Sequence, residues 1–258
     1  MRYIKLIIIG MIGSMMMALS SCTTEAKLAS RFVKEFPPVK AAVYFPEEAQ
    51  VTLVQKDDGT YSHVLDSLDQ NAFLDIMYAA YADELSHYGV EVVIPEDADA
   101  VTTDSTYWMV LLSKVEIQGL FTPYVDYMFD LSGDYEFPFS LNTVNVASWF
   151  DINNGDWHPT QYYEYNLMED FSSHISRESE GPQYHYDITP IKISDVYNFA
   201  VFLGKRCAEG TYSYLLNQYV RQEMGKKGEE PRFKMRWDPY EESLYYMEEE
   251  EGFIEVRD

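Results

Sequence analysis

Hydrophobic and polar positions alternate along the chain in stretches that predict both strands and a helix. Residues 39–45 form a short apolar run after two prolines, which predicts a strand. Residues 67–89 carry apolar side chains at helical intervals, open on the capping-box pattern of Ser67, and end at Gly89. Residues 90–94 are apolar again. This part therefore predicts a strand, a helix and a second strand joined by a right-handed crossover, with the two strands parallel.

The middle of the chain predicts antiparallel strands. Residues 107–117 are apolar on both faces at first and alternate afterwards, which is typical of a strand that starts buried and ends half exposed. Further strands are expected at residues 124–131, 140–152 and 161–167, separated by turn-forming Pro, Gly, Asn and Ser residues. We expect a meander with one face exposed to water.

The last third of the chain predicts less regular structure. Residues 172–191 contain pairs of Ser, Gly and Pro that predict a long loop. Ser194 is expected to cap a helical region that runs to about Met224. Gly204 and Gly210 mark either a close packing contact or a break in it, so we expect one kinked helix or two consecutive helices. Residues 233–237 and 253–256 predict terminal strands around an acidic segment.

The amino terminus has the features of a targeting signal. A basic start with Arg2 and Lys5 precedes an apolar run that is shorter than the ~20 residues of a membrane-spanning helix. The residues that follow, Leu19-Ser20-Ser21-Cys22, resemble the lipobox of bacterial lipoproteins. Ordinary secretion with a cysteine near the cleavage site is the alternative.

The lipobox resemblance implies a membrane anchor. In that family the thiol at the position of Cys22 receives a diacylglyceryl group, the peptide is cut before it, and the new amine is acylated, commonly with palmitate. Several acyl chains hold a protein firmly to a bilayer. By the family's sorting rules, Thr23 implies the outer membrane, and the lack of an acidic cluster after it favours the periplasmic face.

Together these patterns predict an α+β protein, a mixed sheet with one β-α-β crossover followed by an antiparallel meander, with helices packed on one face. We expect residues 1–21 to be a signal peptide, residues 22–38 a lipidated tether, and residues 39–258 a single α+β domain with an acidic C-terminal segment.

The charge of the chain limits its partners. The 258 residues include 43 acidic and 19 Lys or Arg residues, a net charge of −24. Removing residues 1–21 takes away two basic residues and no acid, which leaves −26. Such a chain repels phosphate backbones and anionic lipid headgroups, so nucleic acid is excluded and membrane attachment must come from lipid. Hydrophobic residues make up 47% of the sequence, which is enough for a folded core.

Motifs for catalysis are missing from the sequence. There is no Gly-x-Ser-x-Gly elbow and no phosphate-binding glycine loop, and the five histidines lack the close spacing that preassembles a metal site. We therefore expect no enzyme activity, cofactor or metal. An enzyme with an unrecognised site that uses His185 and Asp187 stays open as an alternative.

Two groups of residues are candidates for a partner surface. Aromatic side chains that could stack on sugars, or simply pack within a sheet, are Trp149, Trp157, Tyr162 and Tyr163. Acidic side chains that could form a solvated face, or dock a basic partner, are Glu241, Glu242, Glu248 and Glu249.

The order of elements over residues 39–118 resembles envelope lipoproteins with the TolB amino-terminal-like fold, which include penicillin-binding-protein activators and transport-auxiliary lipoproteins. The resemblance is a pattern of elements, so it carries over no functional residue. The leading hypothesis is a lipid-anchored, non-catalytic binding or assembly module with an envelope protein as partner. A surface lipoprotein that binds or processes glycans is the alternative, with carbohydrate as ligand.

Overall fold

The structure is a computed structural model that describes residues 23–35, 37–38, 40–56, 59–93, 107–130, 133–153, 160–178, 181–247 and 254–255. The expected signal peptide and Cys22 lie outside the described residues, as do Trp157, Glu248 and Glu249.

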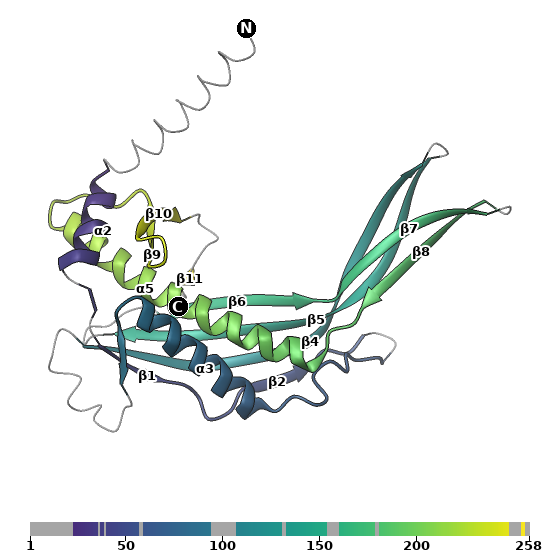
Figure 1. Cartoon of the computed structure of the whole chain (residues 1–258), viewed down its shortest axis with the longest axis horizontal. Coiled ribbons are helices and arrows are strands. Elements are labelled where there is room, and N and C mark those ends of the chain that lie inside the picture. Colours follow the sequence, from purple (N-terminus) through teal and green to yellow (C-terminus); the bar gives the residue numbers. More distant parts are fainter. Residues whose placement is uncertain are drawn as a thin grey trace, which may run out of the picture.

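One mixed sheet forms the body of the protein, which confirms the α+β class (Figure 1). Its order is β11-β6-β5-β4-β1-β3, and β2 also pairs with β4. The pairs β1–β3, β1–β4 and β2–β4 are parallel, whereas β4–β5, β5–β6 and β6–β11 are antiparallel. The strands are β1 (Lys40–Tyr44), β2 (Gln50–Leu53), β3 (Glu91–Val93), β4 (Tyr107–Asp130), β5 (Gly133–Asn153), β6 (Gln161–Met168) and β11 (Ile254–Glu255).

Helix α3 (Gln70–His87) comes between β1 and β3 in the sequence, and these two strands pair in parallel, which confirms the predicted β-α-β unit. Its N-cap is Asp69 rather than Ser67. The Asp69 Oδ1 accepts hydrogen bonds from the backbone N–H groups of Asn71 and Ala72 at 3.0 and 3.1 Å. Gly89 follows the helix at φ +79°, a conformation that side-chain-bearing residues rarely adopt.

Helix α5 (Ile193–Gly225) is one uninterrupted helix, so the alternative of two consecutive helices is wrong. At 33 residues it is about 50 Å long. It begins after Lys192 rather than at Ser194, because the Asp195 carboxylate accepts a hydrogen bond from the Lys192 N–H at 2.9 Å.

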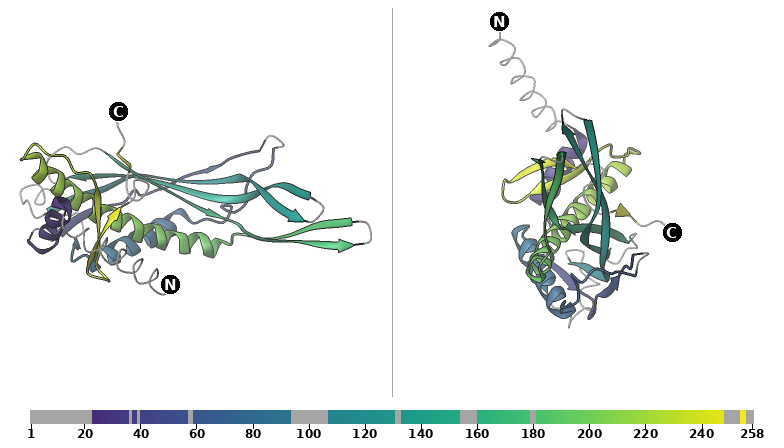
Figure 2. Two further views of the ribbon diagram at one scale, coloured as in Figure 1. Left: turned by 90° about the horizontal axis from the view of Figure 1, so that it is seen from above. Right: turned by 90° about the vertical axis from the view of Figure 1, so that its right-hand side faces the viewer.

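Gly204 lets α5 approach α3 closely. A Cβ atom at this position would lie 2.3 Å from the Met77 carbonyl oxygen and 2.9 Å from the Ala80 Cβ. The glycine therefore marks a packing contact, which is one of the two alternatives that the sequence left open. Both helices lie against one side of the sheet (Figure 2), and their shared core includes Phe73, Met77 and Leu203.

Residues 24–35 correct the expected tether. They form helix α2 (Thr24–Glu35), which packs against the end of α5 (Figure 1). Ala26, Ala29 and Phe32 are buried, and the Phe32 ring contacts the rings of Tyr212 and Tyr219 at 5.8 and 5.5 Å. These residues belong to the body because they recur on one face of a helix, so burying them is favourable.

Strands β4 and β5 are longer than predicted. Thr122 and Pro123 were expected to separate two strands, but β4 continues through them and pairs with β5 as far as Asp130 and Gly133. Beyond Gly119 the described partner of β4 is β5 alone, because the pairing with β2 ends there. One edge of β4 is then free, and strands tolerate proline in that setting.

The long loop predicted at residues 172–191 is wrong for most of these residues. Most of them belong to an antiparallel hairpin of β7 (Asp170–Glu178) and β8 (Gly181–Thr189) rather than to a long loop. One face of this hairpin carries Phe171, Ile175, Tyr184, Tyr186 and Ile188, and these apolar side chains have a neighbouring hairpin to pack against.

The C-terminal part adds another hairpin. Strand β9 (Lys234–Asp238) and strand β11 confirm the two predicted terminal strands, and β10 (Ser243–Met247) lies within the segment expected to be merely acidic. The carboxylate of Glu209 on α5 holds the hairpin to the body, because it accepts hydrogen bonds from Arg206 at 2.5 Å and from Arg236 of β9 at 2.9 Å.

Candidate partner-binding surfaces

The sheet face turned away from α3 and α5, called the open face here, carries two of the predicted aromatic residues. Side chains alternate along β5, so Trp149 and Asn145 point away from the core that Val144, Val146 and Phe150 enter. Trp149 lies opposite Tyr162 of β6, and their rings are 5.1 Å apart at 57°. The Lys114 ammonium lies 4.7 Å from the Trp149 ring.

Amide and carboxylate groups continue this cluster. The Asn145 amide donates hydrogen bonds to the Glu164 carboxylate and, at 3.0 Å, to the Asn166 side-chain oxygen. The Tyr162 hydroxyl donates to the other oxygen of Glu164. Burial and the adjacent Glu164 carboxylate both raise the pKa of Tyr162 above its ordinary value. The open face therefore combines aromatic rings with hydrogen-bond donors and acceptors.

Tyr163 does not belong to this surface. It is one residue from Tyr162 and so points to the opposite face, where it is 7% exposed and its ring packs 4.6 Å from that of Tyr165. Burial is the main cause that raises the pKa of Tyr163, and the hydrogen bond with Tyr165 raises it further.

The described acidic candidates form the turn of the β9–β10 hairpin. Glu242 has a positive φ of 48°, and Glu241 accepts a hydrogen bond from the Tyr245 hydroxyl. The Asp238 carboxylate accepts from the backbone N–H groups of Tyr240 and Glu241 at 2.8 and 3.1 Å, which orders the turn. These acids lie far along the chain from Trp149, and no described contact joins the two sets.

Two hairpins extend beyond the body of the sheet (Figures 1 and 2). Arm A consists of residues 120–130 of β4 and 133–142 of β5, which pair with each other past the end of β6. Arm B is the β7–β8 hairpin. A strand rises about 3.4 Å per residue, so arm A reaches about 35 Å from the sheet.

Aromatic stacking joins the two arms. Phe137 of arm A and Tyr184 of arm B are stacked at 3.8 Å with an angle of 8° between their planes. Phe139 contacts Phe171 at 5.0 Å and Tyr186 at 5.4 Å. Aromatic pairs of this kind contribute about 0.5–1.5 kcal/mol each beyond their buried area.

Asp126 adds a polar contact between the arms. Its Oδ2 accepts hydrogen bonds from the Ser173 hydroxyl at 2.6 Å and the Tyr184 hydroxyl at 3.0 Å. Bonds to a charged acceptor are stronger than neutral ones. The arms are therefore held together along their facing sides, from Phe171 to Tyr184.

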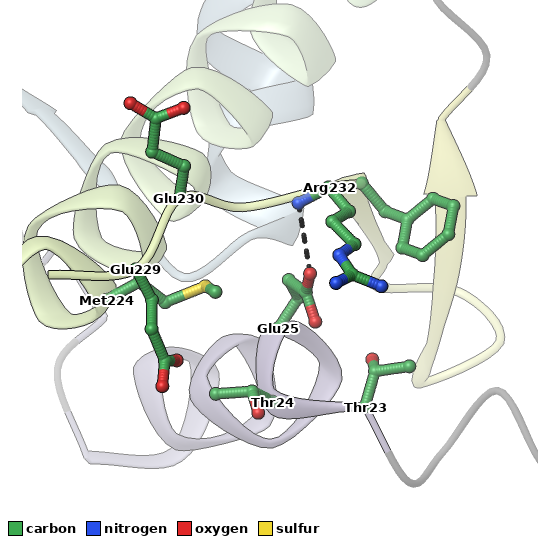
Figure 3. Close-up of a pocket in the computed structure, with 8 residues that line it drawn as sticks. Thr23, Thr24, Glu25, Met224, Glu229, Glu230 and Arg232 are labelled. Atoms are coloured by element: carbon green, nitrogen blue, oxygen red, sulfur yellow. Dashed lines mark hydrogen bonds between the residues drawn. The ribbon is translucent and has the colours of Figure 1, made fainter. Parts of the chain in front are cut away.

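A hollow of about 430 Å³ lies between the start of α2 and the segment that leads from α5 to β9 (Figure 3). Glu25 lies in its centre, is 5% exposed and accepts a hydrogen bond from the Arg232 backbone N–H at 3.1 Å. Glu229 and Arg232 line opposite sides of it. The Glu25 contact fastens α2 to the chain after α5, so this hollow has a structural role in joining the two.

No protein-family model, curated protein or solved structure matches this chain. The resemblance to TolB amino-terminal-like lipoproteins thus stays a prediction. None of the helices in the described ranges is long and apolar enough to cross a membrane. Within the same residues, no group of three or more His, Cys, Asp or Glu side chains is placed to hold a metal ion.

His185 and Asp187 lie on the outer side of arm B. His185 is directly opposite His174, with the rings stacked at 5.1 Å, and its Nε2 is 2.7 Å from the Ser176 hydroxyl. Asp187 is opposite Ser172. Neither residue lines the hollow beside α2, so this hollow adds nothing to the interpretation of the pair as catalytic.

Arm B is the part of this surface that sequence reasoning missed, whereas strands were predicted in arm A. Its signal was present in β8, because Tyr184, Tyr186 and Ile188 alternate with polar residues. The nearby Gly181-Pro182 and Thr189-Pro190 pairs favoured a loop instead.

Proposed function

We propose that the chain is a bacterial lipoprotein, attached by lipid on Cys22 to the periplasmic face of the outer membrane, that binds another envelope protein without catalysing a reaction. The pair of arms carries this proposal. Long hairpins outside a core bury little surface for their length, and aromatic stacking here keeps two of them in one fixed arrangement. Rigid projections of this kind suit the presentation of a binding surface.

The positions of α2 and of the arms support a tethered docking role. Helix α2 begins two residues after Cys22 and packs near the C-terminal end of α5. Arm B ends at Thr189, just before α5 begins. The arms and α2 therefore lie at opposite ends of the body (Figure 1), and a lipid on Cys22 leaves the arms pointing away from the membrane.

The anchor is tested by Cys22→Ala. We expect this variant to leave the membrane fraction, since a body with a charge of −26 after processing has no electrostatic affinity for anionic lipid. Mass spectrometry of the wild-type N-terminal peptide should show acyl groups on Cys22. Retention of the variant in washed membranes would refute the lipid anchor.

The docking role is tested by shortening the arms. Replacing residues 120–142 and 170–189 with short turns should abolish crosslinks to a partner in intact cells. The control carries an Asn217→Ala change, because Asn217 holds β9 through hydrogen bonds with the Met235 backbone at 2.7 and 2.8 Å and lies far from the arms. Thermal melts confirm that both variants fold. Unchanged crosslinks in the folded, arm-shortened variant contradict the proposal.

Glycan binding is a second candidate function, favoured by the Trp149–Tyr162 cluster. Sugars are bound in proteins by aromatic faces next to amides and carboxylates, and Asn145, Glu164 and Asn166 supply those groups. Titration with peptidoglycan fragments should quench tryptophan fluorescence, and Trp149→Ala should remove the response. Protease treatment of intact cells tests the surface version of this function, which complete protection of the protein would exclude.

A further inference from the structure

The outer face of arm A has an unusual pattern for a projecting hairpin. Along β4 the side chains of Thr122, Tyr124 and Asp126 face arm B, so the alternate positions face away from it. An antiparallel hairpin usually places polar residues on its outer face. Here the outward positions of β4 are instead occupied by Phe121, Pro123, Val125 and Tyr127, and those of β5 by their partners Asn142, Ser140, Pro138 and Glu136.

These outward side chains have no described partner strand or helix over them. Tyr127 is 60% exposed and Val125 is 37% exposed. Pro138 and Glu136, which lie opposite them on β5, are exposed as well. We call the residues Pro123, Val125, Tyr127, Glu136 and Pro138 the docking strip. Its members are apolar, one of them aromatic, apart from Glu136, whose carboxylate lies at the outer end; Ser140 lies beside it, opposite Pro123.

Arm B shows that a hairpin at this end of the molecule need not be apolar on its outside. The outward pairs of arm B are Ser172–Asp187, His174–His185 and Ser176–Gln183, which are all polar. Both hairpins project from the same end of the sheet, yet the outward row of β4 in arm A is apolar and the outer face of arm B is polar. Because exposed apolar patches mark interaction sites, this contrast indicates that the docking strip, rather than the arms as a whole, is the binding surface.

The inner end of the same face already holds a cation. The Lys56 ammonium lies 3.7 Å from the centre of the Phe121 ring, well within the range of a cation–π contact. Phe121 is the first of the outward positions on arm A. The next aromatic ring along the row, Tyr127, offers the same kind of face to an incoming Lys or Arg.

Charge decides between a second copy and a different protein. The sequence segments 120–142 and 170–189, which contain the two arms, include eight acids and one Lys or Arg residue, Arg177. A second copy would bring the same acids and a total charge of −26 against them, which disfavours association. A partner with Lys and Arg side chains would instead match both Glu136 and the ring faces.

We propose that the docking strip of arm A binds a basic envelope protein, through a segment that alternates Lys or Arg with apolar residues. This inference rests on the proposed docking function and names its surface and the chemistry of its partner. The apolar side chains of the segment cover Val125 and the prolines, while its cations contact Tyr127 and Glu136.

The first experiment measures binding of a synthetic peptide with alternating Lys and Val to the full-length mature protein by surface plasmon resonance. We expect Glu136→Lys to weaken binding at least about tenfold. The matched control is Asp187→Lys, which makes the same change of charge on the polar outer face of arm B and should alter affinity by less than about twofold. Equal losses of affinity in the two variants would mean that the peptide responds only to the net charge of the protein, and would overturn the inference.

A second probe and a second variant separate the contributions. A peptide with alternating Glu and Val should not bind, and comparable binding of this peptide would contradict the assigned charge. Tyr127→Ser should weaken the Lys–Val peptide about fivefold or more with no change of charge.

Crosslinking in cells distinguishes this inference from the docking function itself. A photoreactive amino acid at position 127 should capture a basic protein, whereas one at position 187 should not. Capture at 187 alone, or capture of a second copy of this chain, would overturn the assignment of the strip. The docking function would survive that result if shortening the arms still abolished the partner crosslinks.

Discussion

At the scale of single residues, the sequence predicted the kinds of residue that matter better than their roles. It singled out Ser67 and Ser194 as helix caps, but the N-cap residues are Asp69 and Lys192. A cap depends on which residue is extended just before the first helical turn, and several neighbouring polar residues satisfy the sequence pattern equally well. Gly204 was correctly noted, yet only its neighbours on α3 show that it serves close packing.

Gly204→Ala tests that packing contact. Alanine is the better helix former by about 1 kcal/mol, but its Cβ would press on the backbone of Met77 and Tyr81. We expect a net loss of about 1–3 kcal/mol in the free energy of unfolding, measured by urea denaturation. Gly225→Ala is the control, since a Cβ there meets nothing within 4 Å. An alanine at 204 that stabilises the protein as much as one at 225 would refute the close approach of the helices.

At the scale of elements, periodicity found β6 but missed β7 and β8, where Gly181-Pro182 and Thr189-Pro190 favoured a loop. Residues 161–167 were predicted and observed almost to the residue as β6. Strand β7 was missed because Ser173 stands between Phe171 and Ile175 on its inner face, which weakens the pattern. Helix α2 was missed because its buried face consists mainly of Ala26 and Ala29, which look unremarkable in a polar segment.

The cap of α3 gives a test at the scale of an element. Asp69→Ala removes two hydrogen bonds to the first turn of the helix, so we expect a loss of about 1 kcal/mol in stability. Ser67→Ala should change stability by less than about 0.5 kcal/mol, because Ser67 is exposed and lies outside the cap. The reverse order of these two losses would restore Ser67 as the capping residue.

At the scale of the whole molecule, sequence predicted the fold class and could not predict the surfaces. Trp149 and Tyr162 meet because β5 and β6 pair in one register, and a shift by a single residue would put Tyr163 in place of Tyr162. The docking strip likewise depends on which side of arm A receives arm B. Both facts arise from long-range pairing, which a local pattern does not contain.

Buried tyrosines give the whole molecule a predictable sensitivity to alkali. Burial raises the pKa of Tyr81 and of Tyr163, so both stay protonated in the folded state when the unfolded chain ionises near pH 10. The unfolded state then binds fewer protons, and stability falls as pH rises. We expect each of them to lower the free energy of unfolding by up to about 1.4 kcal/mol per pH unit above pH 10.

Urea denaturation between pH 8 and pH 11 measures this loss. Tyr81→Phe should reduce the slope above pH 10, although it lowers stability at pH 8 by about 1 kcal/mol through loss of the bond to Thr211. A stability that stays level up to pH 11 would show that these hydroxyls ionise freely in the folded protein.

The continuity of β4 has a mechanical consequence. The strand that pairs with β1 at Tyr107 is the same one that ends in arm A at Asp130, with no loop between the two regions. Arm A consequently has no hinge at its base, and it should tumble with the body as one rigid unit. A pull on its far end would load the β4–β5 hydrogen bonds lengthwise, in shear, so tension applied there would pass straight into the sheet.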